Sequence, residues 1–287
     1  MPVSSDMLDG GVAVITPSPD ASSNTFSPQH FDPFLSCLQE AMVNPSCRSV
    51  VITGSGRFFS SGGNMDDFSD AIENGNIGSR VKEMPDKLHP LLLKMRTSEK
   101  VFVCAINGSA AGGGLGLALA SDYRVCSPEA KLASAFFRLG LSPDGGMTWL
   151  LPRLVGNQVA RKFFFNSEVW SAEQALDYGA VDELADSSVL LERAIEVARD
   201  CGKWSVSSRK GTKQLLDAST STFFETQLHF EQSLMVASSQ TEDFVEGVTS
   251  FKRKREPSFG SLEEEYDGQK TGYHASCEEQ LERSETR

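Results

Sequence analysis

KVFVCAINGSAAGGGLGLALA, residues 100–120, carries the strongest structural signal in the chain. Lys100–Ile106 is an apolar run of strand length, and Asn107-Gly108 ends it. The glycine run at 112–114 then leads into a second apolar segment, Leu115–Ala120. Glycine lets a backbone approach a neighbouring chain or a ligand closely. The stretch therefore predicts a strand, a tight glycine turn and a buried segment that pack together.

The same alternation extends toward the N-terminus. Apolar β-branched runs predict strands, and apolar residues at helical spacing predict helices between them. We expect strands at Val12–Thr16 and Ser49–Thr53, and helices at Pro28–Val43 and 77–96, the last interrupted at Pro85 and Pro90. Strands that alternate with helices at this spacing favour an α/β domain.

Beyond Gly156 the pattern becomes mostly helical. We expect an α/β core over residues 1–200, a helical C-terminal region over residues 201–256, and an acidic tail over residues 257–287 that is disordered. The tail loses hydrophobic periodicity and carries many acidic residues, as solvated extensions do.

Composition excludes several classes of function. The 287 residues include 27 Lys and Arg against 39 Asp and Glu, a net charge of −12, which disfavours binding to nucleic acid. No apolar run is long enough to span a membrane, and no secretion or peroxisomal signal is evident, so we expect a cytoplasmic protein. The six cysteines and four histidines are scattered, so neither a disulfide framework nor a metal site is expected.

A second glycine turn, FFSSGGN at residues 58–64, follows the strand at Ser49–Thr53. Backbone N–H groups exposed at two such turns can converge on one oxygen and form an oxyanion hole, each donor stabilising the anion by about 3–4 kcal/mol. The alternative is that both turns merely allow close packing of strands and helices. The phosphate-binding glycine patterns of nucleotide folds are absent from both.

Asp144 lies in a third turn, LGLSPDGG at residues 139–146. An aspartate in such a turn ordinarily caps the helix that follows. Against an apolar wall formed by Phe136, Phe137 and Trp149, it could instead act as a base. Spacing alone leaves both interpretations open.

Several segments, in unbroken order over roughly residues 10–257, resemble the enoyl-CoA hydratase/isomerase (crotonase) family. They are GRFFSSGGNM (56–65), AINGSAAGGG (105–114), ASDYR (120–124), GLSPDGGMTWLLPRLVG (140–156), SAEQALDYGAV (171–181) and TEDFVEGVTSFKR (241–253). The resemblance implies a spiral core of ββα turns, with C-terminal helices that pack in homotrimers, often paired into hexamers.

The resemblance also implies a site for an acyl-CoA thioester. Backbone N–H groups at Gly63 and Gly113 would polarise the thioester carbonyl, and Asp144 would be the catalytic base. Coenzyme A is then part of the substrate, and neither a separate cofactor nor a metal is expected. The remaining residues expected to contact substrate are Ser61, Gly62, Asn64, Met65, Phe136, Phe137 and Trp149.

The chain departs from the family pattern at two positions. Hydratases of the family use two glutamates, and Gly116 and Phe136 stand in those places here. Asp144 matches the carboxylate of those isomerases that work with one aspartate. The resemblance therefore favours a double-bond shift in an enoyl-CoA, with hydratase or other lyase activity and a noncatalytic acyl-CoA-binding module as alternatives. His89 is expected over the acyl pocket, but the resemblance assigns it no catalytic role.

Overall fold

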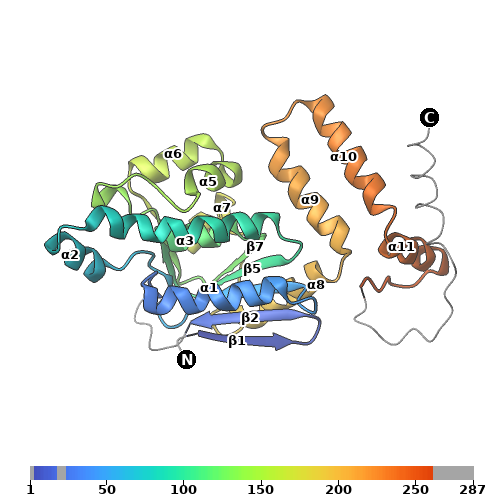
Figure 1. Ribbon diagram of the computed structural model, residues 1–287, viewed down its shortest axis with the longest axis horizontal. Coiled ribbons are helices and arrows are strands. Elements are labelled where there is room, and N and C mark those ends of the chain that lie inside the picture. Colours follow the sequence, from blue (N-terminus) through green and yellow to red (C-terminus); the bar gives the residue numbers. More distant parts are fainter. Residues whose placement is uncertain (1–2, 18–23, 261–287) are drawn as a thin grey trace, which may run out of the picture.

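The computed structural model describes residues 3–17 and 24–260, in which six strands form the main sheet in the order β1-β2-β3-β5-β7-β10 (Figure 1). Only β1 runs antiparallel to its neighbour. The strands are β1 (Val3–Leu8), β2 (Val12–Pro17), β3 (Ser49–Thr53), β5 (Val101–Ile106), β7 (Tyr123–Cys126) and β10 (Glu183–Leu184).

Both faces of this sheet are covered, because successive side chains of each strand point to opposite faces. Phe102, Cys104 and Ile106 belong to the larger core, which also takes in residues of α1 (Pro28–Val43). Val101 and Val103 belong to a second cluster with α8 (Leu190–Gly202). Burial on both faces explains why β3 and β5 are apolar without alternation.

A second, smaller sheet carries the turns of interest. It has the order β4-β6-β8-β9, and its strands are β4 (Phe58–Ser60), β6 (Ser109–Ala111), β8 (Lys131–Ala133) and β9 (Val169–Ser171). The chain passes from the main sheet to this one three times, from β3 to β4, from β5 to β6 and from β7 to β8. Each passage is one turn of a spiral, which confirms the expected fold class.

The helix predicted over residues 77–96 is continuous, so the expected interruption at its prolines is wrong. α3 (Ile77–Thr97) runs through Pro85 and Pro90. Each proline removes one helical hydrogen bond, but Leu88 and Leu91 lie in the core and hold the helix in place. The burial of these leucine side chains outweighs the loss of the hydrogen bonds at the two prolines.

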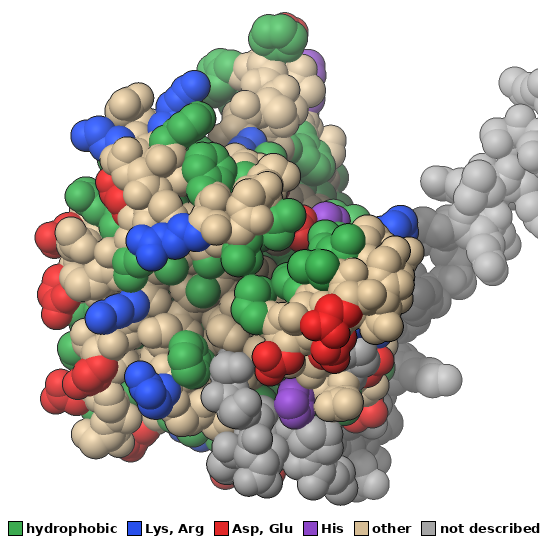
Figure 2. Space-filling view, turned by 90° about the vertical axis from the view of Figure 1, so that its left-hand side faces the viewer, with side chains coloured by type: hydrophobic (Ala, Val, Ile, Leu, Met, Phe, Trp, Pro, Cys, Tyr) green, Lys and Arg blue, Asp and Glu red, His purple; other side chains and the backbone are tan. Residues whose placement is uncertain are grey.

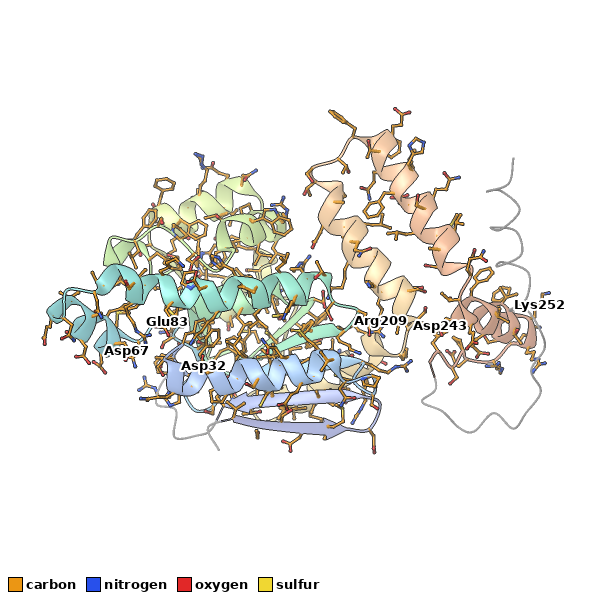
Figure 3. All side chains as sticks on the ribbon, in the orientation of Figure 1. Asp32, Asp67, Glu83, Arg209, Asp243 and Lys252 are labelled. Atoms are coloured by element: carbon orange, nitrogen blue, oxygen red, sulfur yellow. The ribbon has the colours of Figure 1, made fainter. Side chains whose placement is uncertain are left out.

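Ion pairs fix the helices that surround the site. Arg80 of α3 pairs with Asp67 of α2 (Met65–Glu73) and with Glu83 one turn further along α3. Lys87 of α3 pairs with Asp32 of α1. Figure 3 shows these acidic side chains between the three helices.

Five further helical segments lie between β6 and the C-terminal region in the described chain. They are α4 (Gly113–Ala120), the 3₁₀ turn η1 (Phe137–Leu139), α5 (Met147–Val155), α6 (Asn157–Phe165) and α7 (Ala172–Asp177).

Three helices extend from the core as an arm: α9 (Val206–Ser219), α10 (Phe224–Ser238) and α11 (Glu242–Arg253) (Figure 1). Arg209 anchors the first of them, donating hydrogen bonds of 2.9 Å to the carbonyls of Trp204, Arg48 and Glu99. Burial lowers the pKa of Arg209, and the charge of Arg48 acts in the same direction. The anchor thus joins the arm to the end of the main sheet.

Some expectations fall outside the described chain. Most of the acidic tail, residues 261–287, is not described, so its expected disorder is untested. Within the described ranges, no helix is long and apolar enough to cross a bilayer, and no three metal-ligating side chains cluster.

Candidate active site

The largest cavity near the glycine turns has a volume of about 630 Å³. α2, α3 and the segment from η1 to Asp144 form its walls, which are mostly apolar. Figure 2, which views the side where α2 lies, shows hydrophobic side chains around a hollow. Its lining includes Phe26, Phe68, Val81, Met84, Leu88, Phe136, Leu139 and Leu141.

Both glycine turns line this cavity. The parallel pairing of β4 with β6 brings them together, and a Cβ added to Gly62 would lie 3.1 Å from the nitrogen of Gly113. Gly62 can stand there because its φ of +77° suits glycine. The N–H groups of Gly63 and Gly113 donate to no other group in the described ranges. Two unused donors therefore face one cavity, and Gly113 is also the first residue of α4, where the helix dipole is positive.

The Asp144 turn closes against the second glycine turn. Gly145 and Gly146 both have positive φ, which carries the chain sharply into α5. A Cβ on Gly145 would lie 3.4 Å from the Cα of Gly113, so the turn that carries Asp144 packs against the Gly113 turn, and both residues line the cavity. Gly146 occupies the N-cap of α5, and no side chain caps this helix. The helix-cap interpretation of Asp144 is therefore wrong.

The Asp144 carboxylate is held by a residue distant in sequence. Nε2 of His89, on α3, lies 2.6 Å from Oδ1 of Asp144. The carboxylate side chain is 35% exposed and the imidazole 52%. Sequence analysis placed His89 near the pocket but missed this contact, because 55 residues separate the two side chains and no local pattern links them.

The two positions that lack a glutamate differ in their surroundings. A Cβ on Gly116 would lie only 2.4 Å from the carbonyl oxygen of Gly145, so that space is already filled by backbone. Phe136, 9% exposed, lines the cavity. The cavity has two acidic residues in its lining, Asp144 and the exposed Asp66 in the first turn of α2. Only Asp144 adjoins the Gly113 turn.

Most of the residues predicted to contact substrate lie together. Ser61, Asn64, Met65 and Phe136 line the cavity, while Gly62, within the first turn, packs against the second turn and is not among the lining residues. Asn64 also has a structural task, because its Oδ1 accepts a hydrogen bond of 2.9 Å from the N–H of Asp66 and so caps α2. Arg138 lines the same cavity and was not anticipated; no pattern in the sequence singles it out.

Phe137 and Trp149, also expected to contact substrate, are not among the residues that line this cavity. Phe137 packs edge-on against Phe165 with ring centroids 5.6 Å apart. Trp149 lies under the guanidinium of Arg153, 3.6 Å from its ring centroid, and lines a separate cavity beneath the arm.

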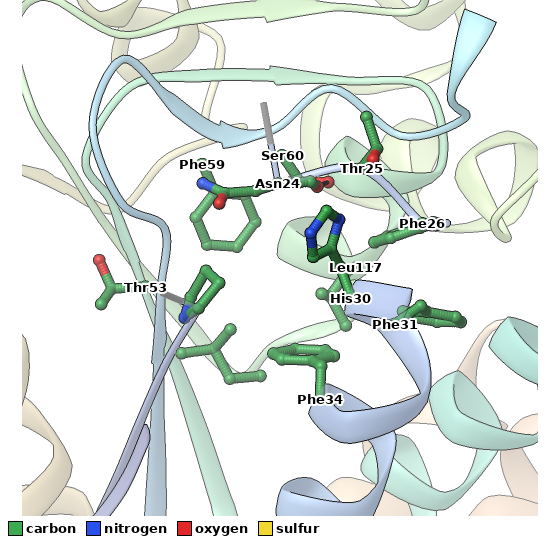
Figure 4. A pocket seen from close by; sticks show the side chains of 12 residues that line it. Asn24, Thr25, Phe26, His30, Phe31, Phe34, Thr53, Phe59, Ser60 and Leu117 are labelled. Carbon is green, nitrogen blue, oxygen red and sulfur yellow. Dashed lines mark hydrogen bonds between the residues drawn. The ribbon is translucent and has the colours of Figure 1, made fainter. Parts of the chain in front are cut away.

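A smaller cavity of about 30 Å³ lies behind the first glycine turn (Figure 4). Phe31, Phe34 and Phe59 line much of it, and Asn24 closes one side by donating to the carbonyl of Phe58 at 2.6 Å. This volume suits one or two water molecules rather than an acyl chain. The cavity therefore belongs to the support of the turn.

Comparison with known proteins agrees with the motifs. Residues 8–262 match the family model of enoyl-CoA hydratase/isomerase, and the chain belongs to that family. It is 30% identical to 1,2-epoxyphenylacetyl-CoA isomerase of Escherichia coli over 255 residues, covering 88% of this chain and 96% of the relative. A probable enoyl-CoA hydratase of Bacillus subtilis is 32% identical over 253 residues, with the same coverage.

Comparison with solved structures supports the same family assignment. A crystal structure of an enoyl-CoA hydratase from Polaromonas sp. JS666 superimposes with a TM-score of 0.82 at 29% identity, covering 90% of this chain and 99% of that one. A putative enoyl-CoA hydratase/isomerase from Mycobacterium abscessus gives 0.83 at 27% identity, covering 90% and 98%. The neighbours thus include proteins named for both activities.

Proposed function

We propose that this protein shifts a double bond in an enoyl-CoA thioester, with Asp144 as its single base. The N–H groups of Gly63 and Gly113 are the donors for the thioester oxygen. Three features support the proposal: both donors are unused, Asp144 adjoins the second of them, and the apolar walls of the cavity suit an acyl chain.

The proposed reaction needs no group beyond the protein and the thioester. The Asp144 carboxylate takes a proton from one carbon of the acyl chain, and the electron pair of the broken C–H bond moves into an enolate. The two amide donors stabilise the enolate oxygen. The carboxyl, which is 35% exposed, exchanges its proton with solvent and then protonates another carbon, so that the double bond moves, solvent hydrogen enters the product and the carboxylate is restored.

The observation that favours a double-bond shift over hydration is the lack of space for a side chain at Gly116. Hydration in this family, as the motif comparison implies, uses two glutamates to hold and split one water molecule. At Gly116 the backbone of the Asp144 turn occupies the position that such a side chain would need. The turn that supplies the one base thus excludes one of the two glutamates.

Substitution of Asp144 tests the assignment. We expect Asp144→Asn to lower the rate of deuterium incorporation from D2O into a panel of 2- and 3-enoyl-CoA thioesters by at least 100-fold, because general base catalysis contributes about 10²–10⁴-fold. Mass spectrometry measures the incorporation. An unchanged rate in the variant would remove Asp144 as the base.

Hydratase activity is the second candidate, favoured by the relatives that carry that name. It predicts water addition to crotonyl-CoA or a longer homologue, visible as loss of the enoyl absorbance. The third candidate, a noncatalytic binding module, predicts acyl-CoA binding by calorimetry without any deuterium incorporation.

We also propose that the arm mediates self-association into a trimer or hexamer. Large apolar side chains on it are highly exposed in the single chain, among them Phe223 at 86%, Phe224 at 78% and Phe251 at 86%. Exposed apolar surface of this kind marks interaction sites. Light scattering coupled to size-exclusion chromatography tests the proposal; a monomer at micromolar concentration would refute it.

A further inference from the structure

The contact between His89 and Asp144 suggests a role that neither the motifs nor the proposed chemistry requires. We infer that His89 is the positioning residue of the Asp144 base: it binds one carboxylate oxygen and leaves the other free for the substrate proton. This inference rests on the proposed function, in which Asp144 transfers that proton.

Packing fixes the position of the helix that carries His89. Leu88, the residue before His89, lies 3.2 Å from a Cβ added to Gly113, and Leu92 lies 4.0 Å from one added to Gly146. α3 therefore contacts the glycine turns on both sides of Asp144, and His89 lies between these contacts. Leu88 is 1% exposed and Leu92 7%, so the core sets the position of the helix along its axis.

Asp144 has no other restraint on its side chain. Within the described chain, its carboxylate forms no hydrogen bond or ion pair besides that with His89, and it caps no helix. A carboxylate free to rotate would spend part of its time turned from the substrate. A base gains rate when it is held in the reactive orientation.

The arrangement divides the two carboxylate oxygens between two tasks. With a proton on Nε2, the imidazole donates to Oδ1 at 2.6 Å, a short hydrogen bond to a charged acceptor. Oδ2 then stays available as the acceptor of the substrate proton. His89 does not itself line the cavity whereas Leu88 and Asp144 do, so it acts through the carboxylate.

Two substitutions of His89 distinguish positioning from a merely structural role. Leucine removes the donor, whereas glutamine places an amide N–H near the position of Nε2. We expect His89→Leu to lower the deuterium incorporation rate at saturating substrate by about 10- to 100-fold with KM unchanged, and His89→Gln to recover most of it. Thermal unfolding should change little, because the imidazole is half exposed.

Lys82→Met is the matched control. It removes an exposed ion pair, Lys82 with Asp86, from the same helix without touching the cavity lining, and should leave the rate unchanged. Two-bond ¹H–¹⁵N correlation spectra add a readout independent of turnover. They should show the Nε2–H tautomer of His89 in the parent protein and a mixture of tautomers in Asp144→Asn.

The outcomes separate the two claims. A parent rate that is abolished by Asp144→Asn but unaltered by His89→Leu would overturn the role of His89 and leave the proposed function intact. A Leu variant that loses rate without rescue by Gln, or a tautomer mixture in the parent protein, would also overturn it. No incorporation by the parent protein with any thioester would overturn the proposed function, and this inference with it.

Discussion

Adding a methyl group at Gly116 tests whether the Asp144 turn is locked against α4. The Cβ of Gly116→Ala would lie 2.4 Å from the carbonyl oxygen of Gly145 and 3.0 Å from its carbon and Cα. All three are backbone atoms, so no flexible side chain can move aside, and the turn itself must shift.

Overpacking of this kind costs about 1–3 kcal/mol of stability. At about 2–4 °C per kcal/mol for a large domain, the midpoint of thermal unfolding should fall by about 2–12 °C. Because displacement of a reacting group by about 1 Å can cost 100-fold in rate, deuterium incorporation into enoyl-CoA should fall by about that factor. Gly116→Glu should behave like Gly116→Ala and gain no hydratase activity.

Gly78→Ala is the control, because Gly78 is also helical and nothing lies within 4 Å of a Cβ added there. Its unfolding midpoint should stay the same or rise, since alanine favours helix over glycine. Differential scanning calorimetry and the incorporation assay measure both variants. If Gly116→Ala unfolds within about 1 °C of the parent protein and keeps its rate, the space is open and the argument against hydration fails.

Two further predictions concern buried polar groups. Burial raises the pKa of the thiols of Cys104 and Cys126 to about 12, so iodoacetamide at pH 8 should modify them only after unfolding, as peptide mass spectrometry would show; rapid labelling in the folded state would contradict this. Because these pKa values are raised above the usual thiol value of 9.0, the stability that the two buried thiols contribute is complete below pH 9 and declines as pH rises toward 12. Lys213 donates hydrogen bonds to two carbonyls and, at 2.9 Å, to Asp122. Lys213→Met should therefore lower the free energy of unfolding, measured with urea, by about 3 kcal/mol. The exposed Lys203→Met should cost under about 0.5 kcal/mol, and equal losses in the two variants would refute the importance of burial.

Local sequence predicted the elements that are buried on both faces. Lys100–Ile106 and Ser49–Thr53 each contain an unbroken apolar run, and both belong to central strands. β1 (Val3–Leu8) escaped prediction because it lies at the sheet edge with four of its six residues exposed, and so its sequence shows no apolar run. Edge strands are stabilised by their one neighbour rather than by burial, which leaves little trace in a hydropathy pattern.

The sequence predicted the parts of the site that lie in short motifs, but not the parts that depend on tertiary packing. The two glycine turns and Asp144 form short motifs of turn residues, and the structure brings them to one cavity. The partner of Asp144 depends on how α3 packs across the turns, which no spacing encodes. Phe137 and Trp149 are near Asp144 in the sequence but outside the lining of the cavity, because proximity in sequence to a site does not set the direction of a side chain.

The anchor of the arm has an evolutionary consequence. All three acceptors of Arg209 are main-chain carbonyls, so these hydrogen bonds depend on the path of the backbone and on no side-chain acceptor at positions 48, 99 or 204. The charges of Arg48 and Glu99 act on Arg209, but a change at either position removes none of the three hydrogen bonds, whereas a change of Arg209 removes them all. Homologues with this architecture should therefore vary around the hinge while retaining a guanidinium at its centre.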